Sequence, residues 1–240
     1  TRSGELVVPQ LFAALDDYSR VACHGQWYLH EDTETFLHGM SQGFQKRSLP
    51  RALLTDNGGA MIAGETGQGM LDLGVNHTTT LTNSPYQNAK AEVFWAQIEG
   101  RLMPMLEGVL ELTLDVLNEA TQAFIEMEYN RKVHSEIGVA PVARMLSGPQ
   151  AGRTCPGSNE LRRSFRLKDE RTQRRSDGTL SIGGVRFEVP SQYRHMERLT
   201  VRYARWDLST VDIVDPQRNV VLATIYPLDK AKNADGRRRA

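Results

Sequence analysis

The chain has 240 residues, of which 40% are hydrophobic and 24% are charged, so it can bury a core and does not belong to the disordered class. It has no apolar run of about eighteen residues, which excludes an ordinary membrane-spanning helix, and no charged-then-apolar leader, so no secretion signal is expected. The net charge is zero, but residues 1–150 carry 10 Lys+Arg against 18 Asp+Glu, whereas residues 151–240 carry 19 against 11. This asymmetry predicts two domains. The basic one is a candidate to bind phosphates, although a solvated surface that is simply basic would have the same composition.

The first half of the chain alternates short apolar runs with helical patterns. A polar turn at residues 16–20 separates two of the runs and predicts a hairpin. Strands are predicted at 11–15, 21–28, 52–55 and 76–79, and helices at 31–44, about 88–103 and about 113–129.

The second half changes to a period of two. Gly- and Pro-rich residues at 148–158 predict a linker, and strands are predicted around 179–182, 185–189, 199–203, 210–214 and 220–225. Five short strands with tight turns favour a small β-barrel. The basic residues after 230 predict a disordered tail, and Cys23 and Cys155 predict two free thiols because neither has a partner at metal-ligand spacing.

Two carboxylates are the candidate metal-binding and catalytic residues. Asp56 follows an apolar strand and Glu92 lies in a predicted helix, with 35 residues between them. The end of a strand and a neighbouring helix in an α/β sheet can bring such side chains together, and carboxylate oxygens are ligands for Mg²⁺ or Mn²⁺. A pair of such ions can promote displacement at phosphorus. Each residue alone is more often a turn residue or a solvated helix charge, so the pairing is what carries the hypothesis.

The surrounding motifs are similar to the catalytic core of retroviral integrases and bacterial DDE transposases. Residues 55–58 (TDNG) and 84–92 (SPYQNAKAE) resemble the two acidic motifs of that class, and residues 15–20 (LDDYSR) resemble a hairpin of its bacterial members. Tyr129-Asn130, followed by His134 and Pro141, resembles the segment that closes their core. Residues 175–179 (RSDGT) and 206–208 (WDL) resemble the C-terminal barrel of phage Mu-type transposases.

The resemblance implies an α/β RNase H-like core, with a mixed sheet flanked by helices, followed by a small all-β barrel. The expected boundaries are a core at 1–148, a linker at 149–159, a barrel at 160–229 and a basic tail at 230–240. The implied activity is metal-dependent cleavage of transposon ends and strand transfer into target DNA. Two alternatives remain open: an RNase H-like nuclease without strand transfer, and a non-catalytic DNA-binding remnant.

One feature of the class is missing from this pattern. Its first catalytic Asp lies on the first strand of the sheet, whereas this chain starts at Thr1, at the turn that follows that strand. The first strand and its Asp are therefore expected upstream of Thr1. Asp16 and Asp17 fall at the far end of the next strand, where a turn role is expected.

The resemblance also implies DNA contacts and partners. The expected contacts are Asn88, Lys90 and Arg101 in the core and Arg174, Arg175, Arg186 and Arg202 in the barrel; a solvated helix charge is the alternative for Lys90. The expected partners are transposon-end and target DNA, further copies of the chain in a synaptic complex and, for some Mu-type members, an accessory ATPase. No membrane is expected, and the implied location is the bacterial cytoplasm, at the nucleoid.

Overall fold

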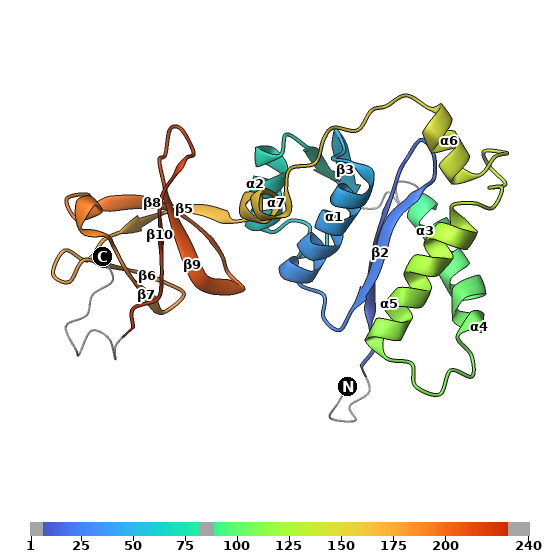
Figure 1. The fold of residues 1–240 in the computed structure, drawn as a ribbon, viewed down its shortest axis with the longest axis horizontal. Helices are drawn as coiled ribbons and strands as arrows, with labels where there is room; N and C mark the ends of the chain where they lie inside the picture. The colour runs from blue at the N-terminus through green and yellow to red at the C-terminus, as the bar shows by residue number, and fades with distance from the viewer. Residues whose placement is uncertain (1–6, 82–88, 230–240) are drawn as a thin grey trace. The chain divides into compact units, whose positions relative to one another are not determined.

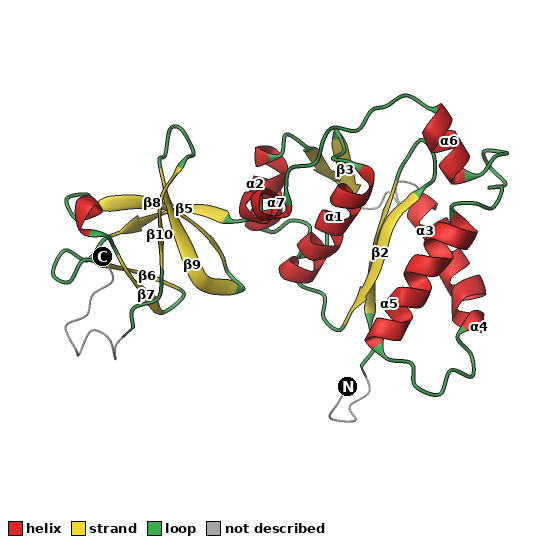
Figure 2. Ribbon diagram, in the orientation of Figure 1, coloured by secondary structure: helices red, strands yellow, loops and turns green. Residues whose placement is uncertain are grey.

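The structure, a computed structural model, describes residues 7–81 and 89–229 of the chain (Figure 1). The chain divides into two compact units, Thr1–Ser164 and Phe165–Ala240. The first is mainly helical with short strands, and the second is built mainly of strands (Figure 2). The predicted basic tail and the predicted contact Asn88 lie outside the described residues.

The first unit contains most of the elements that the sequence predicts. Its strands are β1 (Gln10–Leu15), β2 (Ala22–Tyr28), β3 (Ala52–Thr55) and β4 (Asn76–Thr79). Its helices are α1 (Thr33–Arg47), α2 (Gly64–Asp72), α3 (Ala89–Gln97), α4 (Met103–Met105), α5 (Leu114–Ala123), α6 (Pro141–Ser147) and α7 (Ser158–Ser164). Two π-helical segments, η2 (Ile98–Leu102) and η3 (Phe124–Tyr129), continue α3 and α5.

The strands of this unit form two separate pairs. β1 and β2 are antiparallel, with a bulge at Leu15, while β3 and β4 are parallel. Antiparallel and parallel pairing thus both occur beside helices, as predicted, and in the part of the chain that the structure describes no ladder joins the two pairs.

β2 lies between two helical layers (Figure 1). Because side chains alternate along a strand, Gly25 faces η3 while Tyr28 faces α1. A Cβ at Gly25 would lie 2.9 Å from Ile125 Cδ1, and a Cβ at Gly39 of α1 would lie 3.2 Å from the Tyr28 hydroxyl. The two glycines thus allow both layers to approach β2 closely. The layer on the Gly25 side contains one hydrophobic core cluster of the unit, formed by Ala22, Phe94, Ile98, Leu102, Phe124, Ile125 and Tyr129.

Three helices escaped the sequence patterns. α2 contains three glycines, which lower helix propensity, and α6 and α7 have only seven residues each. The predicted linker is also not free. Arg153 exchanges two backbone hydrogen bonds of 2.9 Å with Leu49, and its guanidinium donates to the Gly74 carbonyl at 2.9 Å. The first compact unit ends at Ser164, the last residue of α7.

In residues 165–229, which the structure describes, the second unit contains six strands, of which the charged first one was not predicted. They are β5 (Leu167–Thr172), β6 (Thr179–Ile182), β7 (Val185–Glu188), β8 (Arg198–Ala204), β9 (Asp207–Val214) and β10 (Val221–Ile225). The order β10-β9-β8-β5 makes one antiparallel sheet, and β6-β7 makes a hairpin. Single bridges at Arg174–Thr179 and Phe187–Pro227 link the hairpin to the segments that follow β5 and β10. The strands thus surround one core, but the ladders themselves do not close into a barrel.

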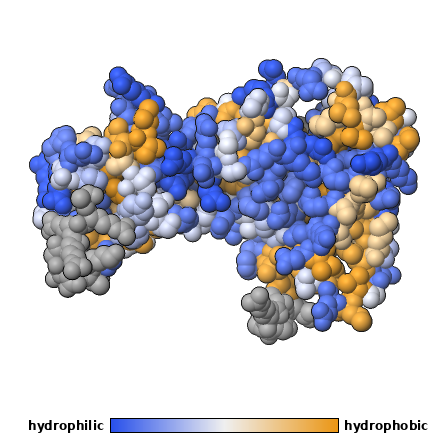
Figure 3. Space-filling model, viewed as in Figure 1, coloured by the Kyte–Doolittle hydropathy of each residue, from blue (hydrophilic) through white to orange (hydrophobic). Residues whose placement is uncertain are grey.

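The surface of the first unit includes exposed apolar residues. Met105, the last residue of α4, is 60% exposed, and Leu110, in the connection between α4 and α5, is fully exposed. This connection carries hydrophobic colour in Figure 3. Patches of this kind mark surfaces for association more often than isolated apolar residues do. In the described residues, no helix combines the length and apolarity that crossing a bilayer requires.

Candidate functional site

Asp56 occupies the turn that directly follows β3. Its Oδ1 accepts a hydrogen bond of 2.9 Å from the Gly58 backbone N–H, and the Asn57 side chain donates to the Thr80 carbonyl at 2.8 Å. The turns after the parallel strands β3 and β4 are therefore tied together. The carboxylate itself is exposed at the carboxyl end of the pair, where α/β sheets place their ligands.

Thr55, the last residue of β3, supports this turn through two further contacts. Thr55 Oγ1 lies 3.0 Å from His77 Nε2, across the β3–β4 ladder, and Thr55 also donates to the Asp56 carbonyl at 3.0 Å. Burial lowers the pKa of His77, which disfavours the charged form of the ring.

Glu31 is a carboxylate beside Asp56 that the sequence patterns did not identify. A Cβ at Gly58 would lie 3.0 Å from Asp56 Oδ1 and 3.6 Å from Glu31 Oε1, so both oxygens approach one point. Glu31 precedes α1, whose N-cap is Asp32, and its sequence neighbourhood suggests only a helix start. Its proximity to Asp56 results from the tertiary fold alone.

Glu92 lies in the first turn of α3, and its direction is set by residues further along the helix. Phe94, Ile98 and Leu102 are each at most 2% exposed, and the Phe94 ring packs edge-on against Tyr129 at 5.0 Å between centroids. A residue two positions before Phe94 lies on roughly the opposite side of a helix with 3.6 residues per turn. Glu92 is accordingly exposed, with its carboxylate turned away from the core.

The described residues do not show a complete metal centre. Among residues 7–81 and 89–229, no group of three His, Cys, Asp or Glu side chains is gathered closely enough to hold an ion. The residues before α3, which connect β4 to the helix of Glu92, lie outside this range. Asp56 and Glu92 therefore remain two exposed carboxylates at the ends of their elements, and their convergence stays a prediction.

The two acidic residues of the β1–β2 turn have different partners. Asp16 accepts hydrogen bonds from the Ser19 backbone N–H at 2.7 Å and from the Ser19 hydroxyl at 2.5 Å, which is the turn role expected of it. Asp17 forms an ion pair with Lys90 at the start of α3. Lys90, a predicted DNA contact, is thus partly neutralised by a carboxylate of its own chain.

Arg101 is held within the unit. It pairs with Glu128 at 3.0 Å and its guanidinium lies over the Phe124 ring, 5.2 Å from the centroid. These contacts fix η2 to η3, a packing role that the sequence did not suggest.

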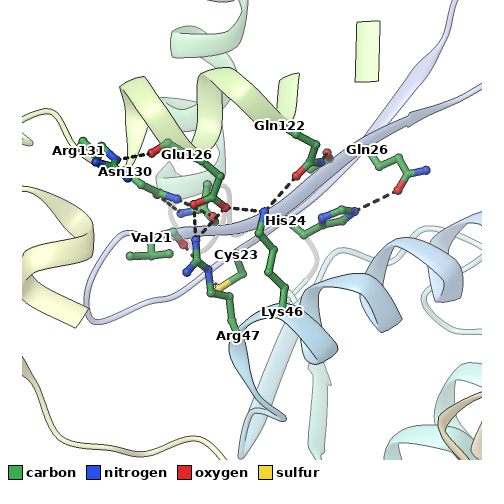
Figure 4. A network of polar contacts seen from close by, with 12 residues as sticks. Val21, Cys23, His24, Gln26, Lys46, Arg47, Gln122, Glu126, Asn130 and Arg131 are labelled. Carbon is green, nitrogen blue, oxygen red and sulfur yellow. Dashed lines mark hydrogen bonds and ion pairs between the residues drawn. The ribbon is translucent and has the colours of Figure 1, made fainter. Parts of the chain in front are cut away.

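A polar network fastens α1 to η3 across β2 (Figure 4). Glu126 accepts from Arg47 at 2.5 and 2.8 Å and pairs with Lys46 at 2.5 Å. Burial opposes ionisation of Glu126, but these hydrogen bonds and charges prevail and lower its pKa. Asn130 pairs with the backbone of Ala22 at 2.9 and 3.1 Å. The network is structural and leaves no nucleophile, because burial raises the pKa of the free Cys23 thiol to about 12.

The predicted DNA contacts of the second unit fall into two groups. The side chains of Arg174, Arg175 and Arg186 are at least half exposed. Arg202, in β8, is only 9% exposed: it alternates with the core residues Val201 and Tyr203 and lies opposite Asp212 in the β8–β9 ladder.

Comparison with known proteins gives a likeness of fold. A chain of the simian T-cell lymphotropic virus intasome in complex with PP2A regulatory subunit B56 gamma aligns with 92% of this chain and 70% of its own length, at 13% identity and a TM-score of 0.52. The HTLV-2 integrase catalytic core domain in complex with magnesium aligns with 56% of this chain and 91% of its own, at 17% identity and a TM-score of 0.44. The BIV integrase catalytic core domain aligns with 57% and 86%, at 20% identity and a TM-score of 0.48. No protein-family model and no curated protein matches the sequence.

Proposed function

We propose that this chain is part of a DNA transposase or integrase of the DDE class, which cuts DNA ends and joins the freed 3′-hydroxyl to target DNA. The observation that carries the proposal is the placement of Asp56 and Glu92. One follows a parallel strand and the other begins a helix, 35 residues apart, in a fold like that of an intasome chain. The first unit is accordingly proposed to be RNase H-like, and the second a small barrel closed by its two single bridges.

The donor set of these residues suits Mg²⁺ or Mn²⁺. Both ions prefer carboxylate and water oxygens, and both side chains are exposed. Bound at this site, such ions would neutralise charge at the phosphorus and lower the pKa of an attacking water. Asp56 and Glu92 would supply oxygen ligands, while the hydrogen bond from Gly58 would hold the Asp56 carboxylate in one orientation. The Glu31 carboxylate would supply a further oxygen near Asp56.

The proposal includes fewer DNA-contacting residues than the sequence suggested. Asn88 and Lys90 precede Glu92 and would approach DNA near the reacting phosphate, and Arg174, Arg175 and Arg186 would bind backbone phosphates elsewhere. Arg101 and Arg202 are left out, because the first packs on Phe124 and the second is buried. Self-association belongs to the proposal as well, and the exposed apolar connection at Met105 and Leu110 offers a surface for it.

Two alternatives keep the same fold. An RNase H-like nuclease would use the same carboxylates without joining strands, and a remnant without catalysis would only bind DNA. The arginines of the second unit favour the transposase over the nuclease, because joining requires two DNA molecules to be held.

Metal binding tests the proposal directly. Mn²⁺ is titrated into the chain and into the variants Asp56→Asn and Glu92→Gln, and the bound fraction is followed by electron paramagnetic resonance. Each variant is expected to weaken binding at least about tenfold, the effect of losing about 1.4 kcal/mol of ligand interaction. Glu99→Gln serves as the control, because Glu99 is exposed on the helical segment that continues α3.

The outcomes separate the three readings. Equal Mn²⁺ affinity in the chain and in both variants would overturn the assignment of the carboxylates as a metal site. If metal binds through them, an assay with a labelled duplex and a plasmid target distinguishes joining from simple nicking. Nicking without joined product, in a protein that includes a third carboxylate, would favour the nuclease.

A further inference from the structure

Three arginines of the second unit meet at one turn. Arg174 Nη1 and Arg186 Nη1 lie 3.9 and 3.7 Å from the same oxygen, Oδ2 of Asp177. Arg194 covers the next residue, since a Cβ at Gly178 would lie 2.7 Å from Arg194 Nε. Gly178 has a positive φ of 66°, a backbone conformation that favours glycine. We name this group, Arg174, Asp177, Gly178, Arg186 and Arg194, the arginine turn.

The turn lies on the solvent side of the β6–β7 hairpin. Leu180, Ile182 and Phe187 point into the core of the unit, whereas Arg186 and Glu188 alternate with them and point outward. The hairpin therefore presents Arg186 as a consequence of packing its apolar face. The packing of the hairpin therefore sets the position of the Arg186 side chain, while its ion pair at 3.7 Å is too long to be a direct hydrogen bond.

The ion pairs of the turn are loose. They measure 3.7 to 3.9 Å, and the Arg194–Glu188 pair measures 3.8 Å. A direct N–H···O hydrogen bond requires roughly 2.7–3.2 Å. Elsewhere in the same unit, Arg166 pairs with Asp212 at 2.9 Å and is 12% exposed. The arginines of the turn thus keep guanidinium donors available, and Arg194 Nε is buried without an acceptor among the described residues.

Asp177 is divided between two roles. Its Oδ1 accepts from the Thr179 backbone N–H at 3.2 Å and from the Thr179 hydroxyl at 2.7 Å, which shapes the turn. Among the described residues, the ion-pair partners of its Oδ2 are the two arginines. One carboxylate oxygen shared by two distant guanidiniums is a poor acceptor compared with a phosphate, which can accept two parallel hydrogen bonds from one guanidinium.

We infer that the arginine turn is a binding site for a DNA backbone phosphate, with Asp177 as the internal competitor that holds the arginines when DNA is absent. The inference rests on the proposed function for DNA as the partner, and it adds Arg194 as a contact and Asp177 as the residue that weakens binding. A phosphate between Arg174, Arg186 and Arg194 would satisfy donors that the chain itself leaves at long distance. Removing the charge of Asp177 would then tighten binding to DNA.

The test measures DNA binding by the full 240-residue chain. A fluorescently labelled, random-sequence duplex is titrated by anisotropy at several KCl concentrations in EDTA, so that no metal occupies Asp56 and Glu92. Asp177→Asn removes the charge but retains Oδ1 for Thr179. Its matched control is Asp215→Asn, because Asp215 is a turn aspartate of the same unit whose Oδ1 accepts from Gln217 and Arg218 backbone N–H groups. Arg186→Gln is paired in the same way with Arg218→Gln, an exposed arginine of that other turn.

Asp177→Asn is expected to tighten binding by about threefold to fivefold, the scale of one exposed charge interaction, with Asp215→Asn within about twofold of the parent chain. Arg186→Gln and Arg194→Gln should weaken binding by a similar factor, and each should reduce the log–log salt slope by about 0.9. Equal tightening by both aspartate variants would overturn the site in favour of general attraction by charge. No DNA binding at low salt, or tighter binding of an RNA duplex of the same length, would also overturn it. Because metal is absent, none of these outcomes depends on whether Asp56 and Glu92 bind Mn²⁺.

Discussion

Asp17, in the turn between β1 and β2, forms an ion pair with Lys90 at the start of α3, two residues before Glu92. The contact brings the β1–β2 turn against the helix that carries a proposed catalytic residue. It also explains Asp17 as the partner of a lysine rather than as a metal ligand. Both side chains are largely exposed, so the pair adds little stability and can open when DNA competes for Lys90.

We expect the 240-residue chain to give no strand transfer with Mg²⁺ or Mn²⁺. Two ions held for an in-line displacement need bridging carboxylates, and only Asp56 and Glu92 are assigned. The measurement is an assay for joined product on a gel, with a labelled duplex end and a supercoiled plasmid. A longer protein that places a further aspartate on an apolar strand ahead of Thr1 should form joined product. Robust joining by the 240-residue chain would instead make Asp17 or Glu31 the third ligand, and Asp17→Asn and Glu31→Gln would decide between them.

Phe94 should determine whether α3 is held on the core. It has no exposed surface and packs on Tyr129, so Phe94→Ala is expected to cost about 3–5 kcal/mol of unfolding free energy. Val93→Ala, at a neighbouring position that is 51% exposed, should change it by no more than about 0.5 kcal/mol. Urea unfolding followed by tryptophan fluorescence in a Trp206→Phe background reports the first unit alone, because Trp27 and Trp95 both belong to it. Equal effects of the two variants would mean that α3 is not packed as described.

The pairing of Glu126 with Lys46 and Arg47 should make stability depend on pH at the acidic side. Because folding lowers the pKa of Glu126, its contribution is present above the ordinary carboxyl pKa and is lost as the pH falls through the lowered value. Near neutral pH, Glu126→Gln should cost about 1 kcal/mol, and the difference from the parent chain should shrink steadily in acid. Unfolding by urea across a pH series measures it. Glu119→Gln, on the exposed side of α5, should show no such trend.

The second unit should fold when residues 165–240 are expressed alone. All ten buried residues of its core cluster lie within that range, so no apolar partner from the first unit is required. Circular dichroism should show a β-rich spectrum and a single cooperative melting transition. Phe187→Ala, at a fully buried core position, should abolish or strongly lower that transition, whereas Ser181→Ala on the outer face should not. A non-cooperative melting transition for the parent fragment would show that the second unit needs the first unit to fold.

The sequence by itself determined the elements whose period is strong. The hairpin at Asp16, the helix of Glu92 and the alternating strands of the second unit all lie where the pattern predicts them, because local periodicity and turn residues are sufficient there. It also placed Asp56 at a strand end, since a short apolar run followed by Asn and Gly has few other conformations.

Only the tertiary structure decided which charged residues are available. Arg101 and Arg202 look like Arg174 and Arg186 in sequence, yet the first packs on an aromatic ring and the second is buried, while the other two stay exposed around Asp177. The approach of Glu31 to Asp56 and the fixing of the supposed linker by Arg153 likewise join residues far apart in the chain. Such contacts depend on how elements pack, and a period of two or 3.6 residues carries no information about them.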